Sequence, residues 1–314
     1  MKSIHGYEIT RALTSENAGF SQWGFCRKDG HEYFIKEFVE IKYPIDRSMF
    51  SPEAYERKIK ICEKFYDEKC RLYKALEKCR TGNNMIVQNF FREGSRYYTV
   101  TDKVCGPVIG VKEVALLSSE KKEVLFKSIL YSISALHRAG IVHSDIKADN
   151  ILLQETFDRY VTAKIIDFDA GFLLNEPQNN VKGDFVYLSP EAFLKMNGEN
   201  INLTEKIDIF ALGILFHQYY TGDLPLIPKE DSQICTAVLN CHEVILYNTL
   251  PSWLRDMIKK MLSLDPADRP DASSLLQFLQ NRSNPVSAPA SNASNIPEQL
   301  TLKKKGFYVP TNLR

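Results

Sequence analysis

The chain has 314 residues, of which 44% are hydrophobic and 25% charged, so its composition is ordinary for a soluble globular protein and its length allows two lobes with separate cores. Forty basic against 39 acidic residues give a formal charge of +1, which argues against a protein built mainly to bind nucleic acid. The seven cysteines form no CxxC pair and no run approaches 18 apolar residues, so we expect a reduced, cytoplasmic protein that does not insert into membranes.

The first hundred residues are predicted to combine short strands with one long helix. Residues 33–38 are rich in β-forming side chains that alternate, and a turn at 27–30 should pair this strand with 21–26. A helix is predicted to begin after Ser51, which suits a cap, with Pro52 at its first position. The apolar side chains that we expect to face inward along this helix are Ile61, Phe65, Leu72 and Leu76.

After about residue 115 the chain is predicted to be mostly helical. Apolar patterning marks four helical segments, at 120–140, 205–222, 251–262 and 271–280. From Asn281 the composition shifts to Ser, Asn, Pro and Ala, as in a linker. The end, "LKKKGFYVPTNLR", is basic and aromatic, and we expect it to dock on the folded body, on a further domain or on a partner.

Polar side chains gather in "HSDIKADNILL", residues 143–153, just before an apolar run that would anchor them. The stretch supplies Asp145, Lys147 and Asn150, and a second carboxylate, Asp167, follows a short apolar strand predicted at 163–166. Two carboxylates and an amide oxygen beside a lysine suit Mg²⁺ bound together with a phosphate substrate. The pattern therefore favours a phosphate-transfer site over a solvated turn.

These stretches resemble motifs of the eukaryotic-like protein kinase family. "HSDIKADN" is similar to the HRDxKxxN catalytic loop, "DFD" to DFG, and "YFIK" stands where VAIK is expected. "YLSPEAF" is similar to the APE motif, and "DIFALG" is similar to the DxWxxG helix, with Asp208 and Gly213 in place. "DPADRP" supplies Arg269 as the partner of Glu191. The six motifs occur in the family's order, and the resemblance covers roughly residues 7 to 280.

The resemblance implies an α+β, bilobal fold. A small, mainly antiparallel β lobe with one long helix is expected at 1–105, and a larger, mainly α-helical lobe at 106–281. The linker and C-terminal tail occupy 282–314.

The resemblance also assigns roles to single residues. Asp145 would accept the proton of the substrate hydroxyl or orient that hydroxyl, and Lys147 would neutralise charge on the transferred phosphate of ATP. The metal ligands for Mg²⁺ would be Asn150 and Asp167. Lys36 would clamp the α- and β-phosphates, held by Glu68. The other positions that would line the nucleotide site are Ala18, Gly19, Phe34, Thr101, Asp102, Val104 and Leu152.

The sequence departs from the family pattern around the nucleotide. Glu16, Ala18 and Ser21 stand at the three glycine positions of the glycine-rich loop, where glycine lets backbone N–H groups approach phosphate. Trp23 and Phe34 stand at positions that normally contact adenine, and two aromatic side chains there would narrow or fill the pocket.

Three further departures lie nearer the chemistry. Ser144 replaces the arginine that usually receives an activation-loop phosphate, and Asp169 replaces the glycine of DFG. Asp184 stands where threonine is usual, and its carboxylate would reach Lys147. Between Asp167 and Glu191 the only side-chain hydroxyls are those of Tyr187 and Ser189, both within the "YLSPE" anchor, so we expect activity that does not depend on phosphorylation of this segment.

Three functions remain open from the sequence. The first is an ATP- and Mg²⁺-dependent protein serine/threonine kinase, for which Lys147 is the local feature favouring serine and threonine over tyrosine substrates. The second is a pseudokinase that acts as a scaffold or allosteric regulator, and the third is a small-molecule kinase. The partner expected for the first is a protein substrate, with no nucleic acid and no membrane.

Overall fold

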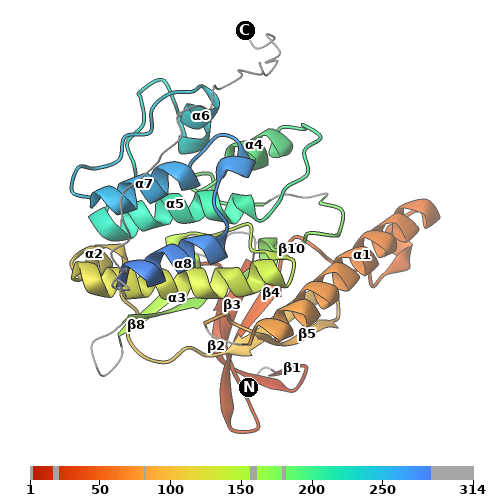
Figure 1. Ribbon diagram of the computed structural model, residues 1–314. Helices are drawn as coiled ribbons and strands as arrows, with labels where there is room; N and C mark the ends of the chain where they lie inside the picture. Colours follow the sequence, from red (N-terminus) through yellow and green to blue (C-terminus); the bar gives the residue numbers. More distant parts are fainter. Residues whose placement is uncertain (1–2, 17–20, 81–82, 156–160, 179–181, 284–314) are drawn as a thin grey trace, which may run out of the picture.

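The computed structural model describes residues 3–16, 21–80, 83–155, 161–178 and 182–283. Two expected nucleotide-site residues, Ala18 and Gly19, lie outside the described residues, as does the tail from 284 onward. Figure 1 shows an N-terminal sheet with one long helix beside it and a larger body of helices.

A six-stranded antiparallel sheet forms the N-terminal part, in the order β1-β2-β3-β4-β6-β5. Its strands are β1 (Ser3–Ile4), β2 (Tyr7–Thr14), β3 (Ser21–Lys28), β4 (His31–Phe38), β5 (Val87–Glu93) and β6 (Arg96–Asp102). The predicted hairpin is confirmed, because Asp29 and Gly30 both adopt the positive φ that a two-residue turn between β3 and β4 requires.

The two faces of β3 and β4 have different surroundings. Ile35 and Cys26 are fully buried in a small core that Val100 of β6 shares. The alternate side chains occupy the other face, because successive residues of a strand point to opposite sides. On that face Phe34 lies across from Phe25, and Lys36 lies across from Trp23.

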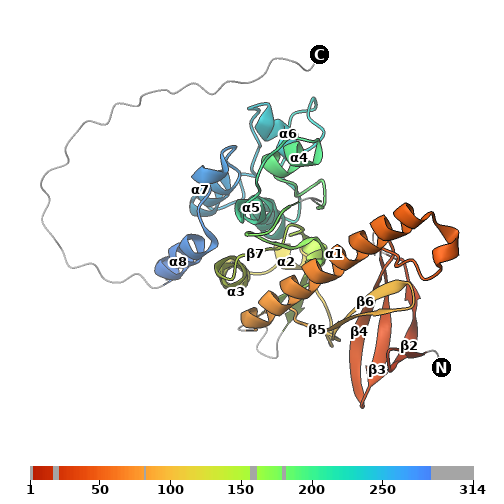
Figure 2. The same cartoon turned by 90° about the vertical axis from the view of Figure 1, so that its right-hand side faces the viewer.

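The long helix α1 (Pro52–Leu76) begins as predicted, with the Ser51 side chain accepting from the Ala54 N–H. Of the four side chains predicted to face inward, Phe65, Leu72 and Leu76 do so, whereas Ile61 is 52% exposed. The inward stripe also contains Cys62, Lys69 and Tyr73. Figure 2 shows α1 running past the sheet towards the helical part of the molecule.

Helices dominate the C-terminal part. They are α2 (Val111–Ala115), α3 (Ser119–Arg138), α4 (Pro190–Met196), α5 (Lys206–Thr221), α6 (Ile234–Leu239), α7 (Ser252–Met261) and α8 (Ala272–Ser283). The helix α5 is buried nearly all round, as its uniformly apolar sequence predicted, and α3 packs against α8 (Figure 1). The remaining strands are β7 (Ile141–Val142), β8 (Ile151–Glu155), β9 (Val161–Ile165) and β10 (Phe172–Leu173).

The predicted fold class is confirmed: an antiparallel sheet with one long helix is joined to a mainly helical lobe. The main core runs from Leu72 and Leu76 of α1 through α3 and α5 to α8, so the long helix belongs to both parts. Among the described residues, none of the helices is both long and apolar enough to span a bilayer.

Candidate active site

Asp208 fixes the loop that follows β7. Its side chain is 1% exposed, and its two carboxylate oxygens accept the backbone N–H groups of His143 and Ser144, each at 2.8 Å. The ring Nε2 of His137 lies 3.0 Å from the same carboxylate. Ser144 has a φ of +67°, a strained value for a non-glycine residue, which these two bonds hold in place.

His143 joins two loops rather than facing solvent. Its Nε2 lies 2.9 Å from the carbonyl oxygen of Ile166, and its Nδ1 accepts from the Asp145 N–H at 3.3 Å. Its ring centroid lies 4.8 Å from that of Phe168. The His143 ring thus packs beside Phe168, and both ring nitrogens are already engaged by backbone groups.

Asp145 lies at the centre of a polar network. Its carboxylate accepts from the Asn150 Nδ2 at 2.8 Å and from the Asp184 N–H at 3.0 Å, and Lys147 Nζ lies 3.3 Å from it. Asp184 Oδ2 lies 3.6 Å from Lys147 Nζ, so the expected approach of that carboxylate is confirmed. Burial opposes the charge of Lys147, but the carboxylates of Asp145 and Asp184 raise its pKa.

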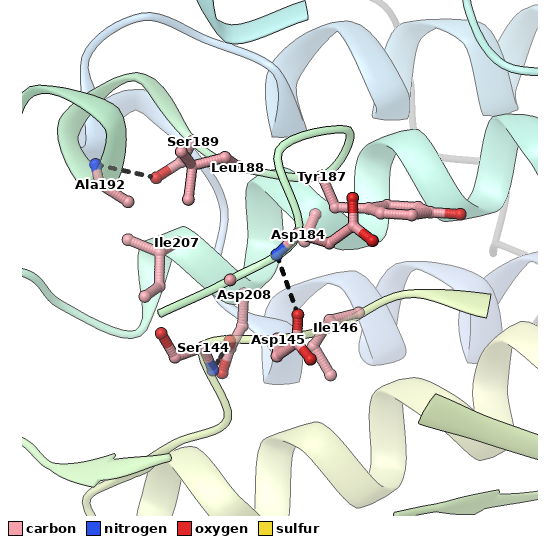
Figure 3. A pocket seen from close by; sticks show the side chains of 12 residues that line it. Ser144, Asp145, Ile146, Asp184, Tyr187, Leu188, Ser189, Ala192, Ile207 and Asp208 are labelled. Atoms are coloured by element: carbon pink, nitrogen blue, oxygen red, sulfur yellow. Dashed lines mark hydrogen bonds between the residues drawn. The ribbon is translucent and has the colours of Figure 1, made fainter. Parts of the chain in front are cut away.

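A small pocket lies beside this network. Figure 3 shows Ser144, Asp145 and Ile146 below it and the segment from Asp184 to Ser189 above it, with the bond between Asp145 and Asp184 closing one side. The other lining residues are Gly183, Ala192 of α4, and Ile207, Asp208 and Ala211 of α5. The pocket has a volume of only about 10 Å³, and the Asp145 side chain beside it is 16% exposed.

Lys36 reaches across from β4 to the residues that follow β9. Its Nζ lies 2.7 Å and 2.8 Å from the carboxylate oxygens of Asp167 and 2.8 Å from Asp169 Oδ2. Burial opposes the charge of Lys36, but the two carboxylates raise its pKa. Asp167 has a φ of +63°, a backbone conformation that Asp tolerates better than most residues.

The expected pairing of Lys36 with Glu68 is wrong. Glu68 is directed to the outer face of α1, where it pairs with Lys64 at 3.8 Å, and its side chain is 37% exposed. Each residue turns about 100° around a helix, so the next position, Lys69, faces inward instead. Lys69 is buried and donates to the backbone carbonyl of Asp169.

The residues expected around adenine lie between the two parts of the chain. Thr101 pairs with Phe34 across the sheet, and Asp102 ends β6. Val104 is partly buried against the main core. Leu152 is half-buried between the buried Ile151 and Leu153 of β8, so it points away from the core that those two enter.

Aromatic rings cover the sheet face above this region. The Trp23 and Phe34 rings stack with centroids 5.7 Å apart, and Phe25 meets both edge-on. The guanidinium of Arg11 lies 5.0 Å from the Trp23 ring. Trp23 also donates from its indole nitrogen to the Glu16 carbonyl oxygen at 2.8 Å, which fixes the ring.

A buried ion pair links α4 to the end of the helical lobe. Arg269 donates from both terminal nitrogens to the two oxygens of Glu191, at 2.6 Å and 2.9 Å, and its side chain is fully buried. The pairing predicted for these two residues is confirmed.

Comparison with known proteins decides the family. Residues 25–279 match the family of the protein kinase domain. The chain belongs to the protein kinase domain family. The kinase motifs predicted from the sequence thus lie in a domain of the expected kind.

The kinase domain is similar to several curated proteins. It is 30% identical over 206 residues to sperm motility kinase Z of Mus musculus, covering 63% of this chain and 40% of that protein. It is 29% identical over 296 residues to a probable serine/threonine-protein kinase of Dictyostelium discoideum, covering 91% of this chain and 18% of that protein. The ovarian-specific serine/threonine-protein kinase Lok of Drosophila melanogaster is 27% identical over 207 residues, 63% of this chain and 42% of that protein. The chain therefore spans less than half the length of each of these relatives.

The kinase's activation segment, the residues from Ala170 to Ser189, is anchored by contacts that involve no phosphate. Phe172 and Leu173 pair with β7, and Glu176 forms a two-pronged ion pair with Arg71 of α1. Lys182 pairs with Glu40 of the N-terminal part, and its carbonyl oxygen accepts from the Ser144 hydroxyl at 3.1 Å.

The two hydroxyl side chains near the end of the activation segment are already engaged. Tyr187 donates to the Gln218 side chain, and burial raises the pKa of Tyr187 to about 12. Ser189 is 1% exposed and caps α4 by accepting from the Ala192 N–H. A phosphate on either hydroxyl would displace a formed contact.

The residues expected to hold Mg²⁺ fit that ion. Asn150 directs its Nδ2 group to Asp145, so its amide oxygen is the atom turned away from that bond. Asp167 is a carboxylate at the same side of the site, held by Lys36. Mg²⁺ is usually held by one or two protein oxygens together with substrate phosphates and water, and it does not require a closed cage. Within the described ranges no three His, Cys, Asp or Glu side chains form a metal cluster.

Proposed function

We propose that the chain is an active, ATP- and Mg²⁺-dependent protein serine/threonine kinase whose activity does not require phosphorylation of the activation segment. The observation that carries the proposal is the connected network of Asp145, Lys147 and Asp184, which orders the segment beside the catalytic aspartate. In kinases that depend on phosphorylation, new arginine–phosphate contacts supply such order.

Each member of the network has a part in transfer. Asp145 accepts the substrate hydroxyl's proton or orients the hydroxyl for attack, because its carboxylate lies at the centre of the network and is 16% exposed. Lys147, kept protonated by two carboxylates, places positive charge beside the phosphate being transferred. Lys36 clamps the other phosphates of the nucleotide. Mg²⁺, when bound, supplies charge stabilisation on the phosphate oxygens.

The direct experiment incubates the protein with γ-labelled ATP, Mg²⁺ and a generic protein substrate such as myelin basic protein. Asp167→Asn is the control, since it keeps the size of the side chain and removes the charge expected at the metal. Label in the substrate that disappears in this variant supports the proposal. Equal label in both proteins, or none in either, contradicts it.

A pseudokinase is the second candidate, and the aromatic cover of the sheet is the observation that favours it. Trp23, Phe25 and Phe34 present their rings on the face where adenine would enter. If Phe34 fills that space, calorimetry should detect no ATP binding to the wild type, and Phe34→Ala should restore it. Binding to the wild type supports the enzyme.

The remaining proposals concern the location and the partners of the protein rather than its reaction. We place the kinase in the cytoplasm with a protein substrate, and we assign the C-terminal tail to docking on the body, on a further domain or on a partner. A small-molecule kinase is disfavoured because the buried pair of Glu191 and Arg269 belongs to the protein-kinase pattern.

A further inference from the structure

Two lysines from different elements converge on Asp169. Lys36 of β4 contacts its carboxylate at 2.8 Å, and Lys69 of α1 donates to its backbone carbonyl. Tyr73, one turn after Lys69, places its hydroxyl 3.4 Å from Asp169 Oδ1. Three side chains thus fix one residue that stands where the related motif has glycine.

The long helix contributes a cation at the place where an acid was expected. Glu68 lies on the outer face, where it pairs with Lys64, while Lys69 faces inward and is 8% exposed. A buried ammonium is costly without an anion nearby. Asp169 and Asp167 supply the negative charge that partly offsets the burial of Lys69.

The acid that meets Lys36 therefore stands after β9 and not on the inward face of α1. The helix carries the cation at Lys69, and the motif after β9 carries the acid at Asp169. Lys36 has two carboxylate partners as a result, Asp167 and Asp169. If Asp167 turns to a metal ion, Asp169 remains to hold Lys36.

We propose that Asp169, rather than an acid on α1, is the positioning residue of Lys36, and that Lys69 holds Asp169 in place. The role of Lys36 towards nucleotide phosphate rests on the function proposed above, whereas its placement by Asp169 does not. The experiments are divided accordingly.

The first experiment is a double-mutant cycle on unfolding in urea, without nucleotide. It compares Lys36→Met, Asp169→Asn and the double variant. We expect the two positions to be coupled by about tenfold in the unfolding equilibrium constant, about 1.4 kcal/mol. The matched cycle of Lys36→Met with Glu68→Gln should show coupling below about twofold. Coupling to Glu68 in place of Asp169 would overturn the proposal.

The second experiment separates positioning from general damage. Asp169→Asn should raise the KM for ATP about tenfold and leave the KM for the protein substrate unchanged, because it frees the lysine that meets phosphate. Glu68→Gln should change neither constant by more than about twofold. An unchanged KM for ATP in Asp169→Asn would overturn the proposal.

The third experiment returns the acid to the helix. Asp169→Gly combined with Lys69→Glu should recover most of the ATP affinity lost in Asp169→Gly alone, whereas Asp169→Gly with Lys69→Met should not. Equal recovery in the two combinations would contradict the proposal that Asp169 takes the place of an acid on α1. If the wild type transfers no phosphate while the first cycle shows coupling, the proposed function fails and the placement of Lys36 by Asp169 stands.

Discussion

At the scale of single residues, the buried ion pair of Arg269 and Glu191 holds two segments of this kinase domain together. Arg269 is enclosed by Glu191 and by the backbone carbonyls of Ser263, Lys206 and Leu264. Taking one partner away leaves the other charge buried and without compensation. The pair thus ties α4, and with it the end of the activation segment, to the loop before α8.

Glu191→Gln should lower the free energy of unfolding by about 3–5 kcal/mol, because the Arg269 guanidinium would remain buried beside a neutral group. Urea denaturation followed by circular dichroism measures this change. Asp223→Asn is the matched control, since its partner Lys112 is 74% exposed, and such pairs contribute at most about 1 kcal/mol. Equal losses in the two variants would contradict the account.

Asp184→Asn tests the effect of the Asp184 carboxylate charge on Lys147. The amide can still accept from the Val186 N–H, as Asp184 does at 2.9 Å, so the turn should survive. Lys147 would lose one of its two carboxylates, and we expect kcat to fall about threefold to tenfold with little change in the KM for ATP. The exposed Glu243→Gln serves as the control in the same steady-state assay. A kcat equal to that of the control would rule out a role for the charge.

Motif spacing pointed to Lys36, Asp145, Lys147 and Asn150 because each stands in a short motif with fixed local geometry, and their catalytic roles stay predictions. The structure does show the contacts among Asp145, Lys147 and Asn150. The motifs did not assign a role to Asp169, since the expected residue there has no side chain. The contact between Lys36 and Asp169 joins residues 133 positions apart in the chain, and no local pattern predicts it.

At the scale of elements, a difference of one position along α1 decides which side chain faces the active site. The inward positions Cys62, Phe65, Lys69, Leu72 and Leu76 follow the three- and four-residue spacing of a helical face. The apolar positions alone predict Phe65, Leu72 and Leu76 on this face, but they miss Lys69, because a lysine at a buried position is uncommon. With Lys69 on the inward face, Glu68 lies on the outer face.

The helix α5 contains a histidine, His217, whose protonation is expected to affect the stability of the fold. His217 is fully buried, its Nδ1 lies 2.9 Å from the Asp223 carbonyl oxygen, and its Nε2 accepts from the Tyr247 N–H at 3.2 Å. Thr221 and the edge of the Tyr247 ring complete its surroundings. Burial lowers the pKa of His217, although its bond to Asp223 opposes that effect.

Acid should therefore weaken the fold through His217. Below the ordinary pKa of about 6.5, the unfolded chain binds a proton that the folded chain does not, so stability is lost as the pH falls from 7 towards 5, by up to about 1.4 kcal/mol per pH unit. His217→Gln should flatten this slope in urea titrations at several pH values. His242→Gln is the control, since its bond to Asp231 raises the pKa of that exposed histidine and gives the opposite sign. An unchanged slope in His217→Gln would contradict this assignment.

At the scale of the whole molecule, the activation segment joins the two parts of the kinase domain. Its ion pairs reach Arg71 of α1 and Glu40 after β4, and its far end is held by Asp145 and Gln218 of the helical lobe. The described part of the activation segment is therefore held by side chains and backbone groups of both parts of the chain.

The measurement that tests the central claim most directly is phosphate transfer by protein that carries no phosphate. The purified chain is treated with a broad phosphatase, mass spectrometry verifies that residues 167–191 are unmodified, and transfer from γ-labelled ATP to myelin basic protein is measured with Mg²⁺. We predict that treated and untreated wild type transfer label at equal rates and that Asp167→Asn transfers none. Loss of most transfer after treatment, with the removed phosphate mapped between residues 167 and 191, would contradict the account, as would a wild type that transfers no label.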